Sequence, residues 1–148
     1  MEKKLNQTDE LENVTLLFAD IAGFTKYAST TDSTIVMSIL RSLFMAFDKK
    51  CLANRVFKLY TIGDCYVVMG VQNISKREYV QEAENVVNMA SGMIEEIIKI
   101  RRSPNFPFSE LDMRIGIHTV KKNFFFIIIY YFVGKFYWWS YWIRHCPL

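Results

Sequence analysis

The chain has 148 residues, of which 51% are hydrophobic, and a formal net charge of +3. Residues 1–120 carry 14 Lys and Arg against 15 Asp and Glu, whereas residues 121–148 carry four basic residues and no acidic one. The basic excess therefore belongs to the C-terminal segment. Because residues 1–120 show no clustered basic face, we expect no nucleic-acid binding.

The three cysteines are Cys51, Cys65 and Cys146, and they share no Cys-x-x-Cys or Cys/His spacing. This pattern argues against a disulfide framework and against a zinc site. The chain starts without the apolar segment of a secretory signal. A length of 148 residues suits one domain, and we expect residues 1–13, which are polar, to be flexible.

The first half of the chain predicts a buried strand, a turn and two helices. Residues 14–19 are a continuous apolar run, residues 20–23 read as a turn, and a short helix begins at residue 24. Apolar residues then recur at helical spacing from residue 35 to about residue 51, after several possible N-caps in residues 30–33.

The second half predicts a hairpin, a long helix and a further strand. Strands at 57–62 and 65–69 flank a Gly63-Asp64 turn, a helix covers 79–102, and a strand covers 111–119. This order of elements predicts an α+β fold with helices on one face of a mainly antiparallel sheet.

Asp20 and Asp64 are the most informative residues of the sequence. Each lies at the end of an apolar strand, and Asp20 is followed closely by a helix start. A single Asp at such a position is an ordinary turn residue. Two carboxylates beside a helix N-terminus, however, favour a site for divalent cations and a triphosphate.

Three motifs resemble the catalytic domain of class III nucleotidyl cyclases, the adenylyl and guanylyl cyclases. They are Val14–Thr25 (VTLLFADIAGFT), Thr61–Tyr66 (TIGDCY) and Met113–Thr119 (MRIGIHT), and the resemblance covers about residues 10–119. It implies a ferredoxin-like βααββαβ domain over residues 14–119, incomplete at the C-terminus. It also implies an enzyme that forms a 3′,5′-cyclic nucleotide and pyrophosphate from ATP or GTP in intracellular signalling.

The resemblance also implies roles for individual residues. Asp20 and Asp64 would hold two Mg²⁺ or Mn²⁺ ions, with the backbone carbonyl of Ile21 as a further ligand. The phosphate contacts would come from the backbone amides of Gly23, Phe24 and Thr25 and from the side chain of Arg114. His118 fits the motif as a structural residue, and Cys65 is explained equally well as a small buried side chain.

One position departs from the family pattern. The residue before Thr-Ile-Gly-Asp is often Glu in guanylyl or Lys in adenylyl members, where it reads the purine, but here it is Tyr60. The chain therefore resembles a metal-bearing half that needs a complementary cyclase domain in a dimer, expected to be a pseudo-heterodimer. Its choice between ATP and GTP stays open.

Residues 120–148 break the family pattern. Residues 124–143 hold 17 aromatic or aliphatic residues among 20, which is the length of a membrane span. Lys135 near its middle and aromatics throughout argue against an anchor. Tryptophan has a single codon, TGG. Reading the DNA one base later turns Trp138, Trp139 and Trp142 into glycine codons, which gives a Gly-Gly-x-x-Gly pattern similar to that of the family. We therefore favour intron read-through followed by a frameshift over a membrane anchor.

Two alternatives to an active cyclase remain open. The first is a catalytically inactive cyclase-homology module that binds nucleotide or a partner domain. The second is a membrane-tethered remnant of a larger receptor-linked or transporter-linked cyclase. In either case we expect the domain to face the cytoplasm and to reach a membrane only through a parent protein or through residues 124–143.

Overall fold

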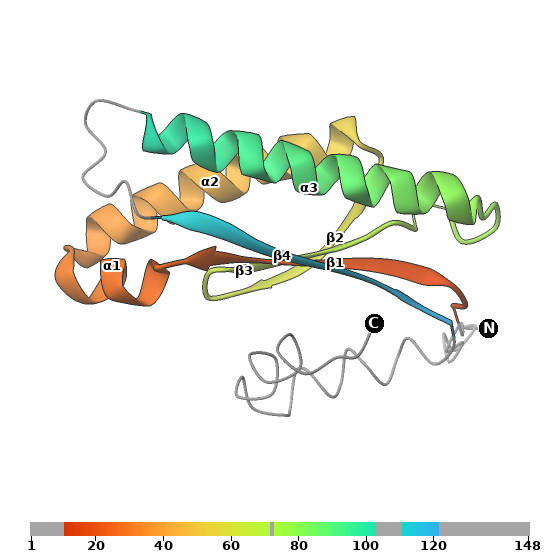
Figure 1. Cartoon of the computed structure of the whole chain (residues 1–148), viewed down its shortest axis with the longest axis horizontal. Helices are drawn as coiled ribbons and strands as arrows, with labels where there is room; N and C mark the ends of the chain where they lie inside the picture. Colours follow the sequence, from red (N-terminus) through yellow and green to blue (C-terminus); the bar gives the residue numbers. More distant parts are fainter. Residues whose placement is uncertain (1–10, 72, 103–110, 122–148) are drawn as a thin grey trace, which may run out of the picture. The chain divides into compact units, whose positions relative to one another are not determined.

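The computed structural model describes residues 11–71, 73–102 and 111–121. Four strands and three helices follow one another along the chain (Figure 1). They are β1 (Val14–Ala22), α1 (Phe24–Thr30), α2 (Ser33–Ala53), β2 (Phe57–Ile62), β3 (Cys65–Met69), α3 (Tyr79–Arg101) and β4 (Asp112–Val120).

The strands form one sheet in the order β2-β3-β1-β4. β3 pairs antiparallel with both β1 and β2. On the other side of β1, Thr15 contacts Thr119 and Asp20 contacts Arg114, so β4 also runs antiparallel to β1. This order and these directions confirm the predicted ferredoxin-like α+β fold.

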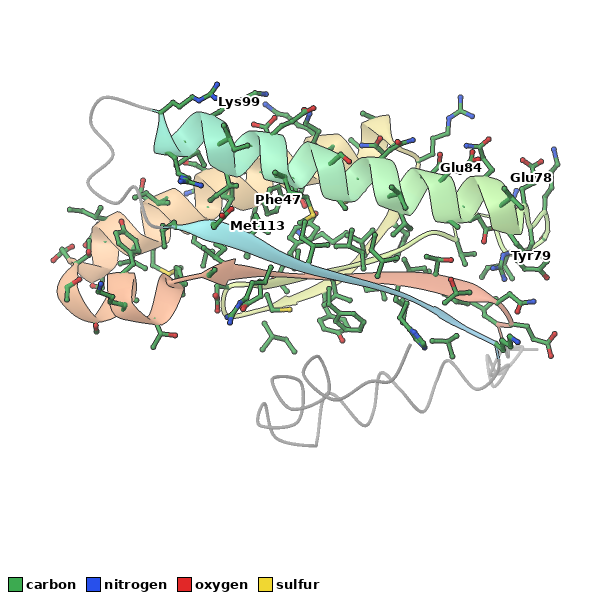
Figure 2. The ribbon with its side chains drawn as sticks, viewed as in Figure 1. Phe47, Glu78, Tyr79, Glu84, Lys99 and Met113 are labelled. Atoms are coloured by element: carbon green, nitrogen blue, oxygen red, sulfur yellow. The ribbon has the colours of Figure 1, made fainter. Side chains whose placement is uncertain are left out.

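The two long helices cover one face of the sheet, and the main core lies between them and the strands (Figure 1). Leu17, Ala19 and Ile21 of β1 point into this core. Figure 2 shows Phe47 and Met113 in the layer between the helices and the sheet. Because side chains alternate along a strand, Phe18 and Asp20 belong to the opposite face. We call it the open face because neither long helix covers it.

A β-bulge in β2 changes which side chains reach the open face. Lys58 pairs with Val68 and Tyr60 pairs with the next residue, Val67, so Leu59 is the extra residue. Regular alternation from Lys58 would turn Tyr60 toward the helices, and the bulge turns it to the open face. After the bulge, Thr61 pairs with Tyr66 and Ile62 pairs with Cys65, so the register is regular up to the Gly63-Asp64 turn.

The sequence prediction of a turn at residues 20–23 was wrong for its first three residues. β1 continues to Ala22. Ile21 is buried in the core with 3% exposure, and its backbone amide hydrogen-bonds to the Asp64 side chain, so the strand is held in place beyond Ala19. Asp20 therefore extends from a strand and not from a turn.

The other elements agree with the sequence within three residues. Asp32 is the N-cap of α2, and its carboxylate accepts a hydrogen bond of 2.8 Å from the Thr34 amide. The chain divides into two units, one of residues 14–119 and one of residues 1–13 and 120–148. Within the described residues of the second unit, the Asn13 amide donates to the Lys121 carbonyl over 3.3 Å.

Several sequence predictions lie outside the described residues. They concern residues 1–10 of the N-terminus and residues 122–148 of the aromatic tail, including 124–143. In the part that the structure does describe, no helix combines the length and the apolar character needed to cross a bilayer.

Two glycines provide a test of the packing between the helices and the sheet. A Cβ at Gly70 would lie 2.8 Å from the Glu82 carbonyl oxygen, which is fixed in α3. We expect Gly70→Ala to lower the free energy of unfolding by about 1–3 kcal/mol. Urea denaturation followed by circular dichroism measures the loss.

Gly92→Ala is the matched control. It lies within α3, and its Cβ would meet only the flexible Lys50 side chain, whose Cδ is 3.0 Å away. The free energy of unfolding should stay unchanged or rise by up to about 1 kcal/mol, because Ala favours a helix over Gly. Equal losses in both variants would contradict the packing described here.

Candidate active site

Asp20 lies on the open face near the C-terminal end of β1. Its side chain is only 8% exposed, and its neighbours in β1 are almost all apolar. The strand is central in the sheet, so its backbone is paired on both sides and cannot move independently. The result is a carboxylate held rigidly in a poorly solvated position.

Asp64 lies at the tip of the β2–β3 hairpin and meets Asp20. Desolvation, a hydrogen bond with Asp20 and the charge of Asp20 together raise the pKa of Asp64 to about 6. Backbone amides of Asp64 and Ile21 donate to the Asp64 carboxylate and oppose this rise. The fold thus brings together two acidic groups that repel each other when both are ionised.

Cys65 is the immediate neighbour of these two carboxyl groups. Burial, followed by the charges of Asp20 and Asp64, raises the pKa of Cys65 to about 12. The thiol therefore stays protonated at neutral pH and does not act as a nucleophile. This fits the sequence interpretation of Cys65 as a small buried side chain.

The candidate ligands fit a site in which Mg²⁺ or Mn²⁺ is bound by few protein groups, and not a site in which the protein supplies all the ligands. Among the described residues, no group of three or more His, Cys, Asp or Glu side chains is placed to hold an ion. Mg²⁺ is commonly bound by one or two carboxylates, with phosphate and water oxygens as its other ligands. Asp20 and Asp64 fit that pattern, and the Ile21 side chain points into the core, which leaves its backbone as the available donor.

Gly23 connects the end of β1 to α1. Its φ of 82° lies in the left-handed region that favours glycine, and its carbonyl accepts the Tyr27 amide over 3.0 Å. Phe24 packs against the core and its ring lies 6.4 Å from that of Tyr27. The first amides of α1, at Phe24 and Thr25, have no acceptor within the helix.

Arg114 comes to the site from β4. Its Nη2 donates a hydrogen bond to Asp20 Oδ2, while 64% of its side chain remains exposed. The sequence interpretation placed Arg114 near phosphates, and the structure gives it a carboxylate partner. The structure thus brings Asp20, Ile21, Asp64 and Arg114 together, and the chain continues from them directly into Gly23, Phe24 and Thr25.

Tyr60 shares the open face with these residues. It pairs with Val67, which pairs with Phe18 of β1, so the three residues form one row across the sheet. The row lies two residues from Asp20 along β1. An aromatic side chain thus stands at the position where the family pattern has a charged one.

A polar cluster that sequence analysis did not identify supports the hairpin. Asp48 of α2 accepts hydrogen bonds from Tyr66 Oη over 2.5 Å and from Lys58 Nζ over 2.7 Å. Partial burial opposes ionisation, but these two bonds keep the pKa of Asp48 below its usual value. Lys58 also lies 5.0 Å from the centre of the Tyr66 ring. Both strands of the hairpin are thereby tied to α2.

An open groove with a volume of about 730 Å³ lies on the helix side of the hairpin. Met37, Phe44, Asp48, Thr61 and Gly63 contribute to its lining, whereas Asp20, Asp64 and Arg114 do not. The groove is therefore separate from the acidic pair on the open face.

Comparison with known proteins identifies the family. Residues 6–121 match the adenylate and guanylate cyclase catalytic domain. The chain is 37% identical over 120 residues to guanylate cyclase alpha of Plasmodium falciparum, covering 79% of this chain. It is 40% identical over 111 residues to a guanylate cyclase of Toxoplasma gondii, covering 72% of this chain. It spans only 3% and 2% of the lengths of these relatives.

Solved structures agree with this match. The guanylate cyclase domain of RhGC from Catenaria anguillulae, in complex with GTP, has a TM-score of 0.63 and 28% identity, covering 76% of this chain and 58% of that one. A dimeric guanylyl cyclase domain of the RhoGC fusion protein from Blastocladiella emersonii has a TM-score of 0.62 and 29% identity, with 76% and 59% covered. The chain belongs to the family of adenylate and guanylate cyclase catalytic domains.

Proposed function

We propose that this chain is the metal-bearing half of a nucleotidyl cyclase site, which converts ATP or GTP into a 3′,5′-cyclic nucleotide and pyrophosphate. In that reaction the ribose 3′-oxygen bonds to the α-phosphorus and pyrophosphate leaves. The observation that carries the proposal is the meeting of Asp20 and Asp64, with the raised pKa of Asp64. Family membership supplies the reaction class.

Asp20 and Asp64 would hold two Mg²⁺ or Mn²⁺ ions, together with the carbonyl of Ile21. Bound there, the cations would supply the positive charge that favours ionisation of the ribose hydroxyl and neutralises the triphosphate. Asp20 lies on the central strand β1, and Asp64 lies at the tip of the hairpin that Asp48 ties to α2. Their contribution is to fix the position of that charge before substrate arrives.

The chain's other residues would bind the triphosphate. The amides of Gly23, Phe24 and Thr25 can donate to the β- and γ-phosphates, and the missing Cβ of Gly23 permits close approach. Packing of the Phe24 ring holds that turn against the core. Arg114 would add a charged hydrogen bond to the same phosphates.

We propose that a complementary cyclase domain completes the site and carries the residues that read the purine. Two observations support this: Tyr60 supplies no charge at the base-reading position, and a solved domain that this chain resembles is described as dimeric. Related proteins are named a membrane guanylyl cyclase and a receptor-type guanylate cyclase. In keeping with these names, we propose a larger parent protein that places residues 14–119 on the cytoplasmic side of a membrane.

A second candidate function is a homology module that binds nucleotide or a partner without turnover. Tyr60 favours it, because this side chain cannot replace the charged base contact of active members. Retention of both Asp20 and Asp64 favours the enzyme. The two candidates differ in turnover and not in binding.

Turnover is tested with the full chain mixed with a guanylyl cyclase domain whose own metal-binding aspartates are replaced by asparagine. In this mixture only the present chain can supply the metal site. With Mn²⁺ and either ATP or GTP, we expect a cyclic nucleotide, measured by mass spectrometry. Asp20→Asn and Asp64→Asn should each lower its formation at least about 100-fold, because a metal contributes several kcal/mol to such a reaction.

Asp112→Asn is the matched control, since it removes an exposed carboxylate from the start of β4, and it should keep the wild-type rate. Absence of product from wild-type chain that still binds nucleotide would overturn the enzyme proposal in favour of the homology module.

The raised pKa of Asp64 predicts an unusual pH dependence of stability without metal. Folding lifts this pKa from 3.8 to about 6, so the native state binds the proton more tightly than the unfolded state. The resulting stabilisation is complete below about pH 3.8 and is lost as the pH rises through about 6. Mn²⁺ should restore stability above pH 6, where the Asp64 carboxylate is ionised.

Urea denaturation in EDTA from pH 5 to pH 7.5 measures this effect as a difference between variants. Asp64→Asn should become more stable than wild type as the pH rises, and it should lose the gain from Mn²⁺. Parallel pH profiles for wild type and Asp64→Asn would show that the two carboxyl groups do not interact.

A further inference from the structure

Asp20 and Asp64 differ in the positive groups that stabilise their negative charge. Asp20 contacts the guanidinium of Arg114, whereas Asp64 receives only backbone amides and its hydrogen bond with Asp20. Among the described residues, no cationic side chain forms an ion pair with Asp64. Within the described part of the chain, Arg114 is therefore the one side-chain cation bound to the pair, and it contacts the less exposed carboxyl group.

The carboxylate and the guanidinium differ in freedom to move. The Asp20 side chain is 8% exposed and extends from a strand that is paired on both sides. The Arg114 side chain is 64% exposed and extends from β4. Separating the pair therefore requires movement of the arginine, which can swing into solvent, while Asp20 stays in place.

An ionised carboxylate in a poorly solvated position needs a positive partner. Either a guanidinium or a divalent cation can meet that need, and both use the same oxygens. Arg114 binds Asp20 Oδ2, so a cation held between Asp20 and Asp64 would lie beside a guanidinium of the same charge and would compete with it for the Asp20 carboxylate.

We propose that Arg114 is the internal counter-ion of Asp20 and competes with the divalent cation for it, an inference that rests on the proposed function. Entry of the cation releases the guanidinium, which is then free to bind the phosphates that accompany the cation. Arg114 thus opposes binding of the metal alone and favours binding of the metal with its triphosphate. Binding of the two ligands is coupled through one side chain.

This role differs from that of a simple phosphate contact. Removing a simple phosphate contact leaves the affinity for the cation alone unchanged. Removing a residue needed only for folding weakens the binding of every ligand. Removing a competing counter-ion strengthens binding of the cation alone, and only this role predicts a gain.

The experiment is a titration of the full chain with Mn²⁺ alone at pH 7.5, with free Mn²⁺ followed by electron paramagnetic resonance. We expect Arg114→Gln to bind Mn²⁺ about 2–5-fold more tightly than wild type, which is the range for an ion pair whose arginine is largely exposed. Arg114→Lys, which keeps the charge, should lie between the two. With a non-hydrolysable triphosphate added, Arg114→Gln should lose affinity for the metal–nucleotide complex relative to wild type.

Arg101→Gln is the matched control. It removes one positive charge from an exposed arginine whose Nη1 lies 3.6 Å from Asp112 Oδ2, away from the acidic pair. It should bind Mn²⁺ as wild type does, and an equal gain in this variant would assign the effect to net charge and overturn the proposal.

The remaining outcomes separate this inference from the proposed function. If wild type binds Mn²⁺ and Asp64→Asn does not, the metal site stands. Unchanged or weaker binding by Arg114→Gln then overturns the counter-ion role alone. If wild type itself does not bind Mn²⁺, the metal site fails and the counter-ion role fails with it.

Discussion

Two carboxyl groups at one end of a sheet repel each other, and the rest of this domain holds them together. Asp20 is fixed because β1 is paired on both sides, and Asp64 is fixed because the hairpin is short and tied to α2 through Asp48. The Ile21 amide links the two by donating to Asp64. A rigid scaffold thus maintains an arrangement that two free side chains would avoid.

The same scaffold separates two tasks between the faces of the sheet. The face toward the helices holds the large apolar cluster that stabilises the fold. The open face holds Asp20 and Arg114, and the bulge adds Tyr60 to it. Because side chains alternate in β1, Ala19 packs in the core while its neighbour Asp20 faces the candidate site. Substitutions on the two faces should therefore affect different properties of the domain.

The sequence predicted most elements because their apolar periodicities are regular. It failed at residues 20–22, where composition suggests a turn but a side-chain hydrogen bond from another segment extends the strand. The motifs predicted Asp20, Asp64 and Arg114 as site residues, and the structure brings them together. They did not predict the contact between Arg114 and Asp20, which depends on the alignment of β4 with β1. The cluster around Asp48 was missed for the same reason, since its members lie on three separate elements.

The bulge at Leu59 has a consequence for how this domain tolerates changes in length. The residues that follow it are held by the pairing of Thr61 with Tyr66 and of Ile62 with Cys65. The extra residue is accommodated as a local kink in an edge strand, and the pairs next to the hairpin tip keep a regular register. A change of length before Leu59 would therefore act on Asp64 through Lys58 and its bond to Asp48, and not through the register of the hairpin tip.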